Sequence, residues 1–161
     1  MTIIEKMIRD FRITGEINTE ITPETAALLG TAVGTYLKGR GGNVVATARD
    51  FSTASRMFKR AFSGGLLATG LEILDLHATS TAILQFVVRR FGAEAGISFS
   101  GRHNEENITG FRIFDGNGVE FNRQTIGEIC KLFESRNFKL VEPRDIGHIS
   151  PVGDTQDIYK R

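Results

Sequence analysis

The sequence contains a single cysteine, which excludes an internal disulfide. That residue, Cys130, stands in an apolar helical stretch, and we expect it to be buried rather than reactive. Lysine and arginine (20 residues) are nearly balanced by aspartate and glutamate (19 residues), which leaves a net charge of +1. This balance provides no bulk electrostatic attraction to nucleic acid or to an acidic membrane, and we expect neither as a partner.

Long apolar runs are also missing. No stretch approaches the roughly 20 residues that a transmembrane helix needs. Residues 1–10 alternate charged and apolar side chains, which is unlike a signal peptide. We therefore expect a cytoplasmic protein. A length of 161 residues with 40% hydrophobic and 24% charged residues is ordinary for one globular domain with a proper core.

Predicted helices and strands alternate along the chain. Thr22 is placed to cap a helix with Pro23 in its first turn, and glycines between 39 and 42 end it. Serines at 52 or 55 and at 80 open two further helices. The pattern predicts helices at about 22–38, 52–69, 80–91 and 124–135, and strands at 43–47, 71–76, 96–100, 110–114 and 119–121. This alternation predicts an α/β fold, a three-layer α/β/α sandwich with a mixed sheet whose late hairpin adds antiparallel strands at one edge.

Residues 115–118 read Asp-Gly-Asn-Gly, which predicts a tight hairpin turn between two strands. The alternative is an aspartate-rich metal loop, but the spacing is that of a hairpin. After the last predicted helix the chain becomes polar. We expect a single α/β/α domain at 1–135 and a polar C-terminal extension at 136–161, with a short helical tail from about Val152.

One segment of the sequence resembles a known active-site loop. Residues 100–105 read Ser-Gly-Arg-His-Asn-Glu, and residues 109–112 read Thr-Gly-Phe-Arg. They resemble the Thr-Ala-Ser-His-Asn-Pro and Asn-Gly-x-Lys motifs of the phosphohexomutases, the phosphoglucomutase/phosphomannomutase family. The family's phosphorylated serine falls on Arg102, and its lysine falls on Arg112.

Further fragments fall in step with the same family. They include 21–37, which resembles its first-helix signature, and 48–55, which resembles Gly-Arg-Asp-x-Arg-x-Ser-Ser. Positions that the family uses for chemistry differ more often: two of its arginines become Ile17 and Ser52, and the prolines of its Pro-Thr-Pro become Ser80 and Ala82. The extension at 136–161 resembles the connector to the family's second domain.

The resemblance implies domain I of this family and, for the family, magnesium held by the phosphoserine and three aspartates of the second domain. We expect no cofactor for the isolated chain and no metal ligands within it. The resemblance supplies no confident catalytic residue, because guanidinium is no phosphoryl carrier. Ser100, two residues earlier, would point elsewhere. The candidate phosphate-binding residues are Arg102, His103, Arg112 and Arg49, with Asn104 beside them; the alternative is that they only satisfy a polar loop.

Other polar residues carry weaker signals. His77, which stands where the family usually has glycine, and His148 have no second ligand at metal spacing, which favours loop positions. Residues 39–42, Gly-Arg-Gly-Gly, follow a predicted helix and precede a strand, unlike a phosphate-binding loop.

Three functions remain open from the sequence. The first is a phosphohexomutase-type domain I in carbohydrate phosphate metabolism, catalytically silent alone and acting as a partner or regulatory domain. The second is part of a divergent or split phosphohexomutase that catalyses intramolecular phosphoryl transfer on hexose phosphates. The third is a sugar-phosphate-binding module. The expected partners are another chain of the family or a hexose phosphate, and the sequence leaves open whether the chain is an enzyme.

Overall fold

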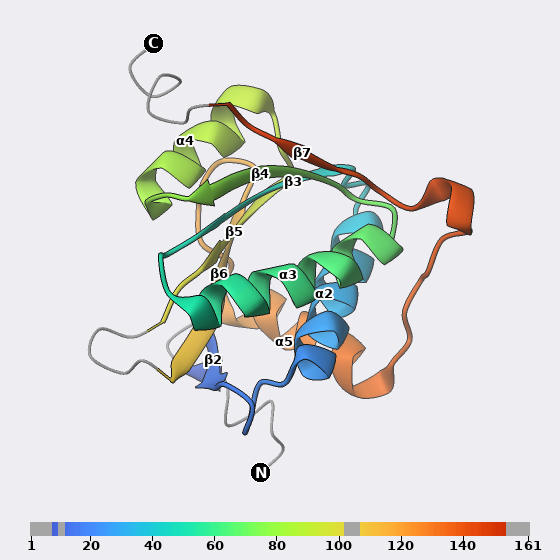
Figure 1. Ribbon diagram of the computed structural model, residues 1–161. Helices are drawn as coiled ribbons and strands as arrows, with labels where there is room; N and C mark the ends of the chain where they lie inside the picture. The colour runs from blue at the N-terminus through green and yellow to red at the C-terminus, as the bar shows by residue number, and fades with distance from the viewer. Residues whose placement is uncertain (1–7, 10–11, 102–106, 154–161) are drawn as a thin grey trace.

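The computed structural model describes residues 8–9, 12–101 and 107–153. A seven-stranded sheet with the order β1-β2-β6-β5-β3-β4-β7 forms its centre (Figure 1). The strands are β1 (Ile8–Arg9), β2 (Arg12–Glu16), β3 (Val44–Arg49), β4 (Glu72–Ala78), β5 (Ala95–Phe99), β6 (Ile108–Asp115) and β7 (Ile149–Pro151). The helices are α2 (Pro23–Lys38), α3 (Thr53–Ala68), α4 (Thr81–Phe91) and α5 (Arg123–Ser135), with a 3₁₀ turn η1 at Pro143–Asp145.

The sheet is mixed, as predicted. Strands β5, β3, β4 and β7 are parallel, while β1, β2 and β6 form an antiparallel edge that joins β5. Helices α2, α3 and α5 lie on one side and α4 lies on the other (Figure 1). The three-layer α/β/α prediction is therefore confirmed.

Local sequence signals explain where the helices begin. The hydroxyl oxygens of Thr22, Ser52 and Ser80 accept from the backbone N–H three residues later, as N-caps do. Helix α4 ends at Gly92, whose φ of 68° suits a residue without a side chain. The helix boundaries agree with those predicted to within one or two residues.

One predicted strand is wrong. Residues 119–121 were expected to form a return strand after the 115–118 turn, but they contribute only an isolated bridge between Phe114 and Glu120. The turn itself is present: the Asp115 carboxylate accepts from the N–H groups of Asn117 (2.9 Å) and Val119 (3.0 Å). Strand β6 instead pairs antiparallel with β2, from the start of the chain, on one side and with β5 on the other.

The segment after α5 returns to the sheet. The Val141 N–H donates to the Ala68 carbonyl and the Gly147 N–H to the Leu67 carbonyl, each at 3.1 Å, before β7 pairs with β4. The domain boundary expected after residue 135 stays a prediction, although β7 shares the sheet of the preceding residues. Most of the helical tail expected from Val152 falls at 154–161, outside the described residues.

An aromatic cluster fixes α3 on the sheet. Phe62 lies 4.8 Å from Phe111 and 5.1 Å from Phe99, centroid to centroid, and Phe58 packs beside them. All four rings are at most 2% exposed. Because these rings anchor α3 over β5 and β6, the polar residues of α3 are held at a fixed position beside the strand ends.

Candidate functional site

The polar residues of interest gather where parallel strands end. Arg49 closes β3, His77 stands near the end of β4, and Gly101 follows β5. Ligands of open α/β sheets commonly bind outside the carboxyl ends of the strands, where neighbouring loops meet. This edge is therefore the place to look for a site.

Asp50 ties the end of β3 to the end of β5. Its carboxylate accepts from the Ser52 N–H (3.0 Å) and hydroxyl (2.8 Å), and from the Gly101 N–H (2.9 Å). Burial pushes the pKa of the Asp50 carboxyl up, but the hydrogen bonds from Gly101 and Ser52 outweigh burial and hold it below its ordinary value. Asp50 is thus an ionised brace that sets the entry to residues 102–106.

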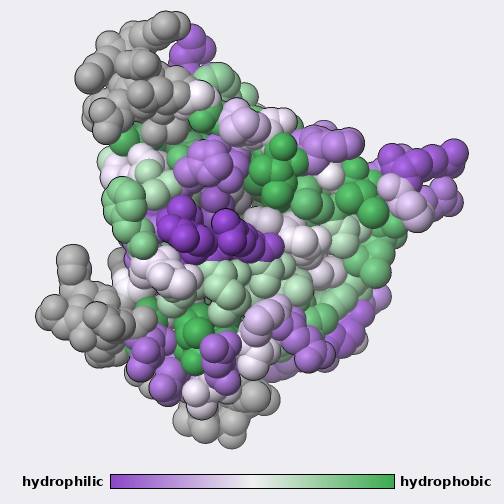
Figure 2. All heavy atoms as spheres, in the orientation of Figure 1, coloured by the Kyte–Doolittle hydropathy of each residue, from purple (hydrophilic) through white to green (hydrophobic). Residues whose placement is uncertain are grey.

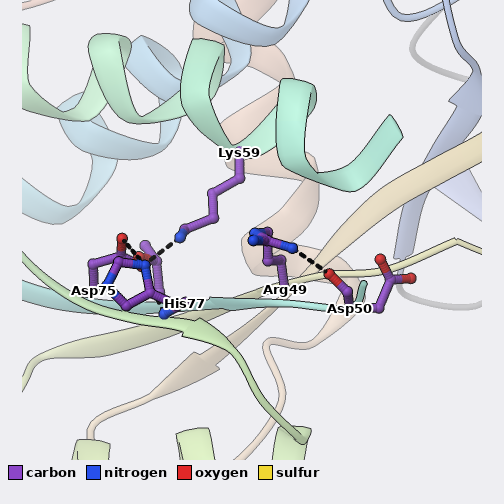
Figure 3. A network of polar contacts seen from close by, with 6 residues as sticks. Arg49, Asp50, Lys59, Asp75 and His77 are labelled. Carbon is purple, nitrogen blue, oxygen red and sulfur yellow. Dashed lines mark hydrogen bonds and ion pairs between the residues drawn. The ribbon is translucent and has the colours of Figure 1, made fainter. Parts of the chain in front are cut away.

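Arg49 precedes Asp50 in the chain, and its side chain extends from the end of β3 toward α3 (Figure 3). It is half-buried and donates through Nη1 to the Asp50 carbonyl oxygen at 2.9 Å. That acceptor is neutral, so the guanidinium charge is not compensated there. Of the predicted phosphate-binding residues within the described ranges, Arg49 is the one that lies at this edge of the sheet.

Asp75 organises a second polar group beside Arg49 (Figure 3). Its carboxylate forms an ion pair with Lys59 of α3, and it accepts from the His77 N–H at 3.0 Å and contacts His77 Nδ1 at 3.2 Å. Burial raises the pKa of Asp75, yet the Lys59 hydrogen bond and the His77 amide together hold it below its ordinary value. The Lys59 and Asp75 side chains are only 9% and 14% exposed, so the pair is largely desolvated.

These side chains line a hollow of about 230 Å³ between α3 and the strand ends. Figure 2 shows strongly hydrophilic side chains gathered in this region of the surface. The lining residues are Arg49, Arg56, Lys59, Arg60, Ser63, Asp75, His77 and Ile149. Arg56, Lys59, Arg60 and Ser63 follow the i, i+3, i+4, i+7 spacing of one helix face, a signal that the motif-based prediction did not use.

Arg112 lies elsewhere. It pairs in register with Ser98, whereas Arg49 pairs with Phe99, so the two arginines lie on opposite faces of the sheet. Its guanidinium forms a two-point ion pair with Glu120, Nε to Oε1 at 3.0 Å and Nη2 to Oε2 at 2.8 Å. The Glu120 hydrogen bonds raise the pKa of Arg112 despite its partial burial. The structure therefore does not bring Arg112 to the Arg49 cluster, and phosphate binding by Arg112 stays a prediction.

Arg102, His103 and Asn104 fall outside the described residues, so their roles stay predictions. The flanks of that segment are described. The Ser100 N–H donates to the Gly110 carbonyl at 3.1 Å, and a Cβ at Gly101 would lie 2.4 Å from the Ile108 carbonyl oxygen. Glycine at 101 is therefore required by a close backbone approach.

Magnesium prefers sites that are rich in carboxylate and carbonyl oxygens. Within the ranges that the structure describes, no group of three or more His, Cys, Asp and Glu side chains is placed to hold a metal ion. Asp50 and Asp75 are each occupied by the donors named above. The described residues do not fit a magnesium site, and His77 and His148 contact carboxylates instead. In the described part of the chain, no helix has both the length and the apolar character to cross a membrane.

Comparison with known proteins agrees with this architecture. The family profile described as "Phosphoglucomutase/phosphomannomutase, alpha/beta/alpha domain I" matches residues 7–140. The chain belongs to the phosphoglucomutase/phosphomannomutase family. Because the matched domain is the three-layer domain I of that family, the resemblance seen in the sequence is confirmed at the level of family and fold.

Individual relatives carry related names. A probable phosphoglucosamine mutase of Pyrococcus furiosus is 36% identical over 144 residues, which cover 89% of this chain and 31% of that protein. A phosphopentomutase of Thermococcus kodakarensis is 35% identical over 127 residues, 79% of this chain and 27% of that protein. The chain thus spans about a third of the length of the curated relatives it matches.

Solved structures show the same fold. A putative phosphomannomutase from Thermus thermophilus superposes with a TM-score of 0.79 at 27% identity, covering 95% of this chain and 34% of that one. A phosphoglucomutase/phosphomannomutase family protein from Burkholderia thailandensis gives a TM-score of 0.83 at 22% identity, covering 96% of this chain and 34% of that one.

Proposed function

We propose that this chain is a phosphohexomutase-type domain I that transfers no phosphoryl group by itself and acts as a binding or regulatory partner of another chain of the family. The observation that carries the proposal is the arginine at 102, which the resemblance of residues 100–105 to the family's active-site loop aligns with the phosphoserine. A guanidinium stays protonated at accessible pH and has no oxygen to accept a phosphoryl group. Phosphoryl transfer also needs charge stabilisation around the moving group, for which the described residues offer no metal-holding set.

Arg102 has a chemistry that suits a partner. Its planar fork can bind a carboxylate at two points, so an acidic loop of a family chain is a fitting target. His103 is the neighbour that would assist. Arg112 would offer its Nε and Nη2 donors to a partner only if Glu120 released them, because Glu120 engages both.

Activity of the isolated chain tests the first part. Purified protein is assayed for interconversion of hexose 1- and 6-phosphates with magnesium and a hexose bisphosphate primer. We expect no turnover above a blank, and none from Arg102→Ser, since the hydroxyl alone does not position substrate or stabilise charge. Turnover that follows the purified protein and survives Arg102→Ala would contradict catalytic silence.

Pull-down of a family member tests the second part. We expect capture that weakens with salt and with Arg102→Glu, whereas Arg90→Glu, on an exposed turn of α4, should leave it unchanged. Equal capture by both variants would rule out docking through Arg102.

The share of its relatives that this chain matches supports a second function, since the matched residues cover 31% of the Pyrococcus furiosus protein. The chain would then be part of a divergent or split phosphohexomutase that acts on hexose phosphates. Mutase turnover that requires both this chain and a second chain carrying the remaining family domains would support this alternative over the silent partner.

A further inference from the structure

The hollow beside α3 carries an excess of positive charge. Four cationic side chains line it, and Asp75 is the carboxylate among its lining residues. Lys59 is paired with Asp75, so the excess consists of the guanidinium groups of Arg49, Arg56 and Arg60. Among the described residues, no carboxylate pairs with any of these three arginines.

Three guanidinium groups that line one hollow without a carboxylate partner among the described residues create a positive potential there, which attracts an anion. We infer that this hollow is a binding site for a phosphoryl group. The site lies on α3 and the ends of β3 and β4, so the inference does not rest on the function proposed for Arg102.

The scaffold of the site is rigid. Arg56 and Arg60 project from one face of α3, which the buried rings of Phe58 and Phe62 fix to the sheet. Arg49 approaches from the end of β3 and points toward α3 (Figure 3), and it lines the same hollow as Arg56 and Arg60. Because the helix face that carries Arg56 and Arg60 is already fixed, their backbone needs no further ordering when an anion arrives, which favours binding.

The Lys59–Asp75 pair forms a neutral floor. The Asp75 charge is balanced by Lys59 and by the His77 N–H, so it does not counter the three arginines. His77 completes the rim with φ at +58°, a left-handed conformation that is uncommon for residues with a side chain. Asp75 holds it there by accepting from its amide while contacting its ring at Nδ1.

Charge and size both favour a phosphoryl group. A phosphate monoester carries nearly two negative charges and three acceptor oxygens, whereas a carboxylate offers one charge and two oxygens. Guanidinium forks match phosphate oxygens at two points each. A hollow of about 230 Å³ holds a phosphoryl group with a small attached body, and Ile149 gives it one apolar wall. The source is either free inorganic phosphate or the monoester of a small metabolite.

Titration of the whole chain with inorganic phosphate, and separately with glucose 6-phosphate, tests the site by amide chemical shifts at low ionic strength. Saturable shifts at residues 56–63 and at His77 are expected with both. Tighter binding of glucose 6-phosphate would identify a monoester as the ligand, and equal binding would identify the phosphoryl group alone; both support the site. Shifts that sodium chloride reproduces at equal ionic strength would overturn it.

Variants locate the binding. Arg56→Gln and Arg60→Gln should each weaken phosphate binding about tenfold, the effect of losing one charged hydrogen-bonding group. Both side chains are exposed, so the fold should survive, and a thermal melt checks this. Arg90→Gln is the matched control and should bind as the parent does. Unchanged binding in the Arg56→Gln, Arg60→Gln double variant would refute the site.

Discussion

The Gly101 N–H donates to Asp50 Oδ2 at 2.9 Å, across 51 residues of sequence. The same carboxylate accepts from Ser52, the N-cap of α3. One side chain therefore aligns the end of β3, the start of α3 and the residue that leads into the 102–106 segment.

Replacing the brace should loosen this edge. Asp50→Asn removes the charge that strengthens three hydrogen bonds, and we expect a loss of about 1–3 kcal/mol in the free energy of unfolding. Urea unfolding measures the loss, and faster amide exchange at Gly101 would locate it. Asp145→Asn, at an exposed carboxylate, is the control and should cost little. Equal stability of the two variants would show that Asp50 braces nothing.

Stability should fall at acid pH because of Asp50 and Asp75. Both pKa values lie below the ordinary 3.8 in the folded chain, so the unfolded chain takes up protons first as pH falls. The stability that these two carboxylates contribute is complete above about pH 5. It is lost as the pH falls below 3.8 and passes the lowered pKa values of the folded chain. Urea unfolding between neutral and acid pH should show this decline.

Urea unfolding of Asp75→Asn over the same pH range isolates the contribution of the Asp75 carboxylate. The variant should be less stable at neutral pH, because the largely buried Lys59 loses its carboxylate partner. Its stability should also fall less steeply with acid than that of the parent. Parallel pH profiles for parent and variant would argue against the lowered pKa of Asp75.

Helices α2 and α3 approach too closely for a side chain at Gly65. A Cβ there would lie 2.2 Å from the Ala27 carbonyl oxygen and 2.4 Å from the Thr31 amide nitrogen. Gly65→Ala should therefore destabilise the fold by about 1–3 kcal/mol. Gly64→Ala is an adjacent control: nothing lies within 4 Å, and better helix propensity should stabilise by up to about 1 kcal/mol. Thermal melts of the two variants should shift in opposite directions.

Cys130 should be unreactive in the folded chain. It is buried, and burial together with the Glu134 charge raises the pKa of its thiol to about 11. Because the thiolate is the reactive form, a disulfide reagent at neutral pH should modify it slowly in buffer and rapidly in urea. Fast modification of the native protein would show that this part of α5 opens easily.

Much of this fold is readable from local sequence. The starts of α2, α3 and α4 follow from Thr22, Ser52 and Ser80, because a cap acts within one helical turn. Apolar periodicity located α5 and strands β3 to β6, but it did not predict β1, β2 or β7. The order of motifs indicated the family. The 115–118 turn was likewise predicted, since its Asp and Gly residues act on their own backbone.

Strand pairing could not be read in this way. Residues 119–121 form one bridge to the end of β6, whereas β2, about a hundred residues earlier, pairs with the start of β6. Nothing in the sequence of 119–121 indicates this outcome, because it depends on contacts distant along the chain. The return of the segment after α5 to form β7 is equally non-local. Pairing depends on which edges and apolar faces meet, and that is settled only when the whole sheet assembles.

The candidate site likewise has features that the sequence indicated and features that only the tertiary structure shows. The sequence alone indicated the family and the three-layer fold, and it placed Arg102 in the segment that resembles the family's active-site loop, because these depend on residue identity and order. Only the tertiary structure decided that Arg112 lies across the sheet with Glu120, and that Arg49 shares a hollow with Arg56 and Arg60. The reason is physical: strand alternation and register assign each side chain to a face, and helix packing then brings charges distant in sequence together.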